Sequence, residues 1–142
     1  MQILQNLHPV FKDPTKYSNF VVDNSAGCLA RIIISHGSKI PMDQVLGGLI
    51  QVLPLREDFV ENDIIYGCLL DLLKSGNSSV ANLMGPIISL FSRILGSDDL
   101  KKEIQISIIN MIKELKNKYQ KQMDTIFQEL KQEEKENLIK FL

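Results

Sequence analysis

The sequence predicts an all-α fold in which antiparallel helix pairs stack on one another, and two patterns in the chain support this prediction. The first is a pair of apolar helical stripes within residues 41–76, separated by a Pro-Leu-Arg-Glu-Asp break. Two short helices cannot hide both apolar faces from water by pairing only with each other, so they need neighbours of similar shape. The first stripe consists of Met42, Val45, Leu46, Leu49, Ile50 and Leu53, and the second of Ile65, Tyr66, Leu69, Leu70 and Leu73.

The second pattern is an internal similarity of the chain at a spacing of roughly 38 to 40 residues. Shifted by 40 positions, residues 27–29 (GCL) overlay residues 67–69 (GCL). Shifted by 38 positions, residues 45–50 (VLGGLI) overlay residues 83–88 (LMGPII). This spacing is near that of HEAT and armadillo repeats, and it exceeds the roughly 33 or 34 residues of ankyrin and tetratricopeptide repeats. We therefore expect an α-solenoid of HEAT-type helix pairs.

Two helices are expected before the central stretch. A short helix over residues 1–7 should end at His8 and Pro9, because proline disfavours a helical residue before it and has no amide hydrogen to donate. A second helix should run from about Tyr17 to His36, with Gly37 as its stop. Its packed side is expected to comprise Ala26, Leu29, Ala30, Ile33 and Ile34, with Gly27 allowing close approach of the adjacent helix.

The remaining helices follow from turn residues. Pro41 suits the first turn of the third helix, and Pro54 ends that helix. The acidic residues Glu61 and Asp63 lie at the start of the fourth helix, where the helix dipole favours negative charge. A serine cap near residue 78 should start a fifth helix, with Pro86 as a kink inside it, and a sixth helix should run over about residues 100–119. The apolar faces of these two helices are Val80, Leu83, Met84, Ile87, Ile88, Phe91, Ile94 and Leu95, and then Ile104, Ile108, Met111, Ile112, Leu115 and Tyr119.

The composition changes near Asp98, because residues 98–142 hold nine lysines and nine acidic residues. A charged but neutral segment with short stripes is typical of the terminal cap of a solenoid, whose outer face meets water. The stripes are too short for a coiled coil. We expect six to eight helices in an open right-handed stack: a single array over 1–142, with a partial repeat at 1–37, full repeats at 38–76 and 77–119, and cap helices at 120–142. The cap stripes are Met123, Ile126, Phe127 and Leu130, then Leu138, Ile139 and Leu142.

Composition and spacing argue against several function classes. With 142 residues, 44% apolar residues and a net charge of −1, the chain can form a packed core and carries no bulk positive charge for nucleic acid. It has neither an apolar run long enough to span a membrane nor the basic start of a signal peptide. Cys28 and Cys68 fall at equivalent repeat positions, which suits buried reduced thiols.

No catalytic, cofactor or metal site is expected, so the chain is not expected to be an enzyme. His8 and His36 lack the spacing of metal ligands. The glycines fall in helix interiors without a following Gly-Lys-Ser/Thr, so they form no phosphate loop. Ser89 and Ser92 lack the context of a nucleophile.

Residues 23–33 (DNSAGCLARII) and 41–58 (PMDQVLGGLIQVLPLRED) resemble the C-terminal HEAT repeats of the importin-beta family of nuclear transport receptors. The similarity is to the importin beta-3 (importin-4/5-like) branch, in which a DN-x-x-G-x-x-A/G-R/K-I-I helix precedes a helix pair containing L-P-L-K-E-D. The end of the chain, residues 130–138, is similar to the short terminal helix of those receptors. Residues 47–48 (GG) and 131–132 (KQ) depart from the family pattern.

The resemblance implies the C-terminal region of a nuclear import receptor that binds cargo proteins with basic import signals, such as histones and ribosomal proteins. It also implies binding to Phe-Gly nucleoporins and shuttling between cytoplasm and nucleus. Family members are several times longer, so most of the Ran-GTP contact would lie in amino-terminal repeats that this chain lacks. The alternative is a HEAT scaffold of a multisubunit complex with no transport role, which should bind neither basic peptides nor Phe-Gly segments.

Candidate cargo-binding residues lie at the start of the second helix of each pair. Stacking would align them as an acidic ladder along one edge of the concave wall, where carboxylates and amides can bind basic signals by charge-assisted hydrogen bonds. The alternative is that they only cap helices and complement helix dipoles. The candidates are Asp23, Asn24, Glu61, Asn62, Asp63, Asp99 and Glu103.

Overall fold

A computed structural model describes residues 2–142, and over this range it contains nine α-helices, three short 3-10 helices and no strand. The all-α prediction is confirmed, although the helices outnumber the six to eight expected. The α-helices are α1 (Gln2–Lys12), α2 (Asn19–His36), α3 (Met42–Gln51), α4 (Asn62–Lys74), α5 (Ser78–Asn82), α6 (Met84–Ile94), α7 (Lys102–Lys118), α8 (Gln120–Glu129) and α9 (Gln132–Ile139). The 3-10 helices are η1 (Pro14–Lys16), η2 (Gly37–Lys39) and η3 (Phe59–Glu61).

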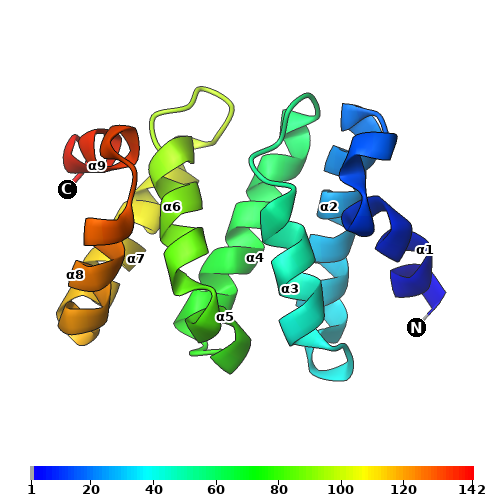
Figure 1. Ribbon diagram of the computed structural model, residues 1–142, viewed down its shortest axis with the longest axis horizontal. Helices are drawn as coiled ribbons and strands as arrows, with labels where there is room; N and C mark the ends of the chain where they lie inside the picture. Colours follow the sequence, from blue (N-terminus) through cyan, green and yellow to red (C-terminus); the bar gives the residue numbers. More distant parts are fainter. Residues whose placement is uncertain (1) are drawn as a thin grey trace.

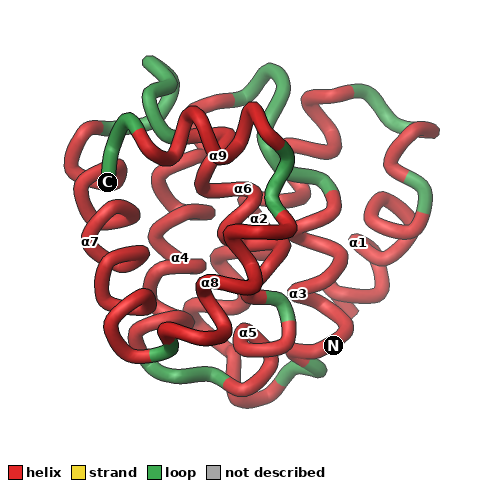
Figure 2. Tube along the Cα trace, turned by 60° about the vertical axis from the view of Figure 1, so that its left-hand side comes forward, coloured by secondary structure: helices red, strands yellow, loops and turns green. Residues whose placement is uncertain are grey.

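The helices form two layers that run along the length of the molecule (Figure 1). In the first layer α1 contacts α3, α3 contacts α5 and α6, and α6 contacts α8. In the second layer α2 contacts α4, and α4 contacts α7. The last helix, α9, turns back across α6, as the rotated view of Figure 2 also shows. Each segment therefore packs mainly on the segments next to it in the chain, which defines a helical solenoid of HEAT-like repeats.

The core lies between the two layers, and it is made largely by the predicted stripes. All five residues of the second central stripe are buried, as are Leu46, Leu49 and Ile50 of the first. Four assignments were wrong, because Ile34 is 51% exposed, Tyr119 41%, Ile139 74% and Leu142 41%. Ile34 lies one helical turn from the exposed Arg31, on the outer face of α2. Tyr119 lies beyond the last residue of α7, where the helical periodicity no longer applies.

Helix ends at prolines differ from the expectations. Pro9 does not end α1, which continues to Lys12 because Val10 is buried and Phe11 packs against the core. Pro86 does not kink a long helix. The chain breaks between α5 and α6 instead, so Pro86 lies in the first turn of α6, where an amide hydrogen is not needed.

Two capping residues also differ. Asn77 caps α5, and its side chain accepts hydrogen bonds from the amides of Ser79 and Val80. Pro41 is the N-cap of α3 and lies just outside its first turn. Within residues 2–142, no helix is both long enough and apolar enough to cross a membrane.

Candidate partner-binding edge

The connections that lead into α2, α4 and α7 all lie along the same edge of the molecule, the upper edge in Figure 1. Five of the seven predicted binding residues lie in these connections or in the first turns of the helices that follow, whereas Asp23 and Asn24 lie in the second turn of α2. Stacking therefore brings them to one edge, as the repeat spacing implies. Their side chains nevertheless differ in burial and in bonding.

Asp23 joins α2 to the connection that precedes α4. Its side chain is buried, with 1% exposed. Its Oδ2 accepts hydrogen bonds from the backbone amides of Arg56 at 3.1 Å, Glu57 at 2.8 Å and Asp58 at 2.9 Å. Charge-assisted bonds of this kind are stronger than bonds between neutral groups. We use the word tie for a hydrogen bond between a side chain of one second-layer helix and the connection that leads into the next second-layer helix.

Asn62 forms the corresponding tie between α4 and the connection that precedes α7. It is also 1% exposed, and its Nδ2 donates to the carbonyl oxygen of Asp99 at 2.9 Å. Its Oδ1 is buried and has no hydrogen-bond partner. The tie at Asn62 therefore consists of one bond from a neutral donor, whereas the tie at Asp23 consists of three bonds to a charged acceptor.

Glu61 forms an ion pair across the same junction as Asp23. The Nη1 atom of Arg31 lies 2.8 Å from Oε2 of Glu61, whose side chain is 12% exposed. A Cβ atom on residue 27 would collide with this carboxylate, so Gly27 leaves room for it. The close approach expected at Gly27 is thus that of a glutamate side chain from the 3-10 helix before α4.

The other candidate residues reach the surface. Asn24 donates from Nδ2 to the Phe20 carbonyl oxygen, 2.8 Å away, within its own helix. Asp63 pairs with Lys101 at 3.0 Å, and its hydrogen bond is the main reason that the pKa of Lys101 is raised. Asp99 and Glu103 are exposed, and within the described range neither side chain takes part in an ion pair.

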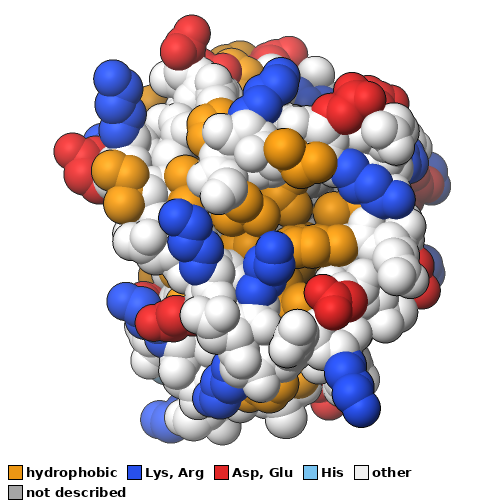
Figure 3. Space-filling view, turned by 90° about the vertical axis from the view of Figure 1, so that its left-hand side faces the viewer, with side chains coloured by type: hydrophobic (Ala, Val, Ile, Leu, Met, Phe, Trp, Pro, Cys, Tyr) orange, Lys and Arg blue, Asp and Glu red, His pale blue; other side chains and the backbone are white. Residues whose placement is uncertain are grey.

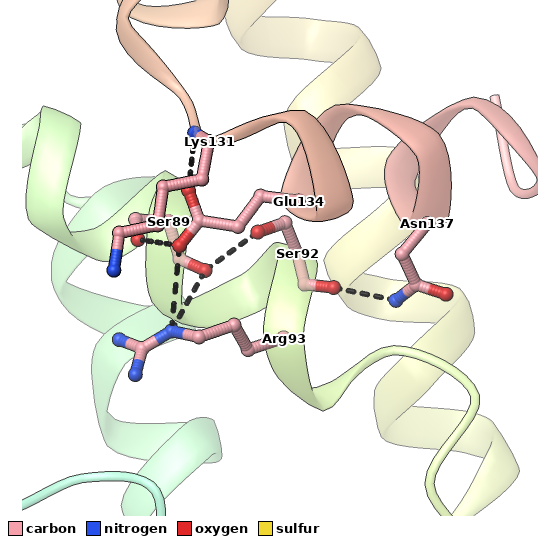
Figure 4. A network of polar contacts seen from close by, with 6 residues as sticks. All are labelled: Ser89, Ser92, Arg93, Lys131, Glu134 and Asn137. Carbon is pink, nitrogen blue, oxygen red and sulfur yellow. Dashed lines mark hydrogen bonds and ion pairs between the residues drawn. The ribbon is translucent and has the colours of Figure 1, made fainter.

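One polar network falls outside the sequence expectations, and it holds α9 on α6 (Figure 4). Glu134 is 7% exposed, and its Oε1 accepts a hydrogen bond from the Ser89 hydroxyl at 2.7 Å. Its Oε2 accepts from the backbone amide of Lys131 at 3.0 Å, and Arg93 Nε lies 3.7 Å from Oε1. In the sequence, the only local indication of this network is that Glu134 lies three residues after the N-cap of α9, the position of the glutamate in a capping box. Its partners on α6 lie about 45 positions earlier in the chain, so no local pattern points to them.

An apolar groove lies in the first layer between α1 and α3. It has a volume of about 270 Å³. Its apolar lining comes from both of these helices and from Leu29 of α2. The apolar residues from α1 and α3 are Leu4, Leu7, Phe11 and Val45.

Among residues 2–142 no group of three or more His, Cys, Asp or Glu side chains is arranged to hold a metal ion. Both cysteines are free thiols, with Cys68 buried and Cys28 half-buried. Burial, and to a lesser extent Asp71, raises the pKa of Cys68 to about 12. Burial also raises the pKa of Tyr66, whose ring packs near that of Phe91.

Two helical layers, tied from one second-layer helix to the next, define a HEAT-like α-solenoid. Extended surfaces that bind other proteins are typical of this class. The chain is 34% identical over 122 residues to a protein of Schizosaccharomyces pombe named probable importin subunit beta-4, covering 84% of this chain and 11% of that protein. It is 27% identical over 92 residues to human importin-4, covering 65% of this chain and 8% of that protein.

The chain belongs to the importin-beta family and to its importin-4 branch. No protein-family model matches it. It spans only about a tenth of the length of the curated relatives that it matches.

Proposed function

We propose that the chain is part of a nuclear import receptor, and that the edge at the start of α2, α4 and α7 binds the basic import signals of cargo proteins. The observation that carries this proposal is the similarity to two proteins named as importins. In keeping with that family, we propose that the complete receptor moves between cytoplasm and nucleus. We also propose that it binds Ran-GTP mainly through repeats that this chain lacks.

The bonding at this edge narrows the proposal. The carboxylate of Asp23 and the amide of Asn62 are buried in ties, and Asp63 is paired with Lys101. The candidate groups that remain accessible to cargo are the exposed carboxylates of Asp99 and Glu103 and the exposed amide of Asn24. An exposed ion pair contributes only about 0.2 to 1 kcal/mol, so an extended basic segment that makes several pairs fits better than a single anchoring residue.

The direct test is the binding of a fluorescently labelled lysine-rich import peptide, measured by anisotropy at increasing salt. Affinity should fall as salt rises, and Glu103→Lys should weaken binding about two- to fivefold. Glu114→Lys is the matched control, because Glu114 is exposed on the same helix but lies near its other end. Equal effects of the two substitutions would show that only net charge matters.

The apolar groove between α1 and α3 supports a second part of this proposal, the binding of Phe-Gly nucleoporin segments. A groove of about 270 Å³ with apolar walls can accept a phenylalanine side chain. Leu4→Ser should weaken binding of a Phe-Gly peptide, whereas Ile3→Ser should not, because Ile3 is 52% exposed and does not line the groove. A HEAT scaffold without a transport role would bind neither this peptide nor the basic one.

A further inference from the structure

A second apolar groove lies at the end of the stack where α7, α8 and α9 meet, and Figure 3 shows apolar side chains gathered on this face. The groove has a volume of about 300 Å³. Ile139 is 74% exposed and Leu142 is 41% exposed beside it, so the apolar surface is open to solvent. The lining residues are Phe127, Leu130, Leu138, Ile139 and Leu142, together with Lys116 and Lys135.

The two lysines are held at the groove by other groups of the protein. The Nζ atom of Lys116 lies 4.9 Å from the centre of the Phe127 ring, as in a cation–π contact. The Nζ atom of Lys135 donates to the carbonyl oxygen of Gln128 at 2.9 Å. Because these contacts already restrict both side chains, less conformational entropy is lost when a partner pairs with them.

The charged side chains that line this groove are both lysines. Five acidic residues lie on α8 and α9, yet none of them lines the groove. In Figure 3, lysine and arginine side chains lie around the apolar patch, and acidic side chains lie at part of its border. A basic segment would be repelled here, and an uncharged apolar segment would leave both lysine side chains without an acidic group to pair with.

We propose that this groove binds a short segment of another protein in which a large apolar side chain is flanked by aspartate or glutamate residues. The apolar side chain would cover Ile139, and the flanking carboxylates would pair with Lys116 and Lys135. None of the residues that line this groove belongs to the edge proposed for basic cargo. This inference does not depend on the cargo proposal.

The test uses a fluorescein-labelled peptide of the pattern Glu-Asp-Leu-Phe-Glu-Asp and measures its anisotropy with the complete chain. We expect saturable binding that weakens with salt and is lost when the peptide's acidic residues are replaced by their amides. Ile139→Ser should weaken binding about tenfold, since it removes a large apolar contact. Ile106→Ser is its matched control, because Ile106 is 57% exposed and does not line the groove.

The lysines are tested in the same assay. Lys116→Glu and Lys135→Glu should each weaken binding at least twofold, whereas Lys113→Glu, an exposed lysine of α7 that does not line the groove, should leave it nearly unchanged. Failure of the acidic peptide to bind, or equal binding of its amide form, would overturn the proposal. It would also be overturned if Ile139→Ser abolished self-association in sedimentation experiments while the acidic peptide had no effect, because the occupant would then be a second copy of the chain.

Discussion

The carboxylate of Asp23 is one of the few charged groups inside this molecule, and its three amide donors explain why it is tolerated there. A buried charge is costly unless hydrogen bonds replace those it made with water. The bonds also fix the backbone that leads into α4. Asp23 thus contributes to the position of the next helix pair in the stack.

Replacing Asp23 with alanine should lower the free energy of unfolding by about 2 to 3 kcal/mol, because three amides lose a charged acceptor. The measurement is urea unfolding followed by circular dichroism. Asn24→Ala is the control, because Asn24 is adjacent and exposed and bonds only within α2. It should change the free energy by less than about 0.5 kcal/mol. Similar losses in the two variants would mean that the tie does not stabilise the stack.

The buried thiol of Cys68 predicts a loss of stability at alkaline pH. Its pKa is raised to about 12 in the folded chain, and in the unfolded chain the thiol should ionise near its ordinary value of about 8.5. Above that value the unfolded state therefore binds fewer protons than the folded state, and the free energy of unfolding falls as pH rises from about 8.5 towards about 12. Urea unfolding under reducing conditions should show a shallower decline in Cys68→Ala than in the natural chain. Parallel declines would assign the effect to other groups.

Most helices bury one stripe each, and the stripes of α4 and α6 include fully buried residues. Leu69 and Ile87 are both 0% exposed. Leu69→Ala and Ile87→Ala should each lower the free energy of unfolding by about 2 to 5 kcal/mol, because the surrounding helices cannot close the cavity completely. Ile34→Ala, on the outer face of α2, should cost less than about 0.5 kcal/mol in the same thermal or urea melt.

Helix existence and type could be predicted because apolar periodicity is local information. The stripe of α4 is buried in full. The effects of Pro9 and Pro86 on helix ends could not be predicted from the sequence. Packing against distant parts of the chain decides whether a helix continues through a proline or breaks before it. The roles of Asp23 and Glu134 were likewise hidden. Their partners lie 33 to 35 and about 45 positions away in sequence, so neither a cap motif nor a charge pattern reveals them.

The starts of α2, α4 and α7 lie along one edge of the molecule, and the repeat spacing placed the candidate residues along such an edge. The spacing could not distinguish side chains that are free to bind a partner from side chains that form ties within the molecule. Polar residues are expected at the same positions in both cases. The division into repeats at 38–76 and 77–119 and the cargo-binding residues remain predictions.

Because segments pack mainly on their neighbours, substitutions at opposite ends of the stack should act independently. Asp23 lies in α2 and Leu138 in α9, at the two ends of the view in Figure 1. The unfolding free energy lost in Asp23→Ala with Leu138→Ala should equal the sum of the single losses within about 0.5 kcal/mol. Asp23 and Glu61 lie at the same junction, so the double variant Asp23→Ala with Glu61→Ala is the comparison. Its loss of unfolding free energy should differ from the sum of the two single losses. Strong coupling between the two distant sites would contradict a linear array.

The unequal ties give the molecule a stiffness that varies along its length. The junction of α2 with α4 is braced by three bonds to a carboxylate and by the partly buried pair of Arg31 and Glu61. The junction of α4 with α7 has one neutral bond and the surface pair of Asp63 and Lys101. Bending should therefore concentrate at the second junction. A partner lying along the edge would change the curvature of the solenoid there, while the part built around α2 and α4 moves as a rigid body.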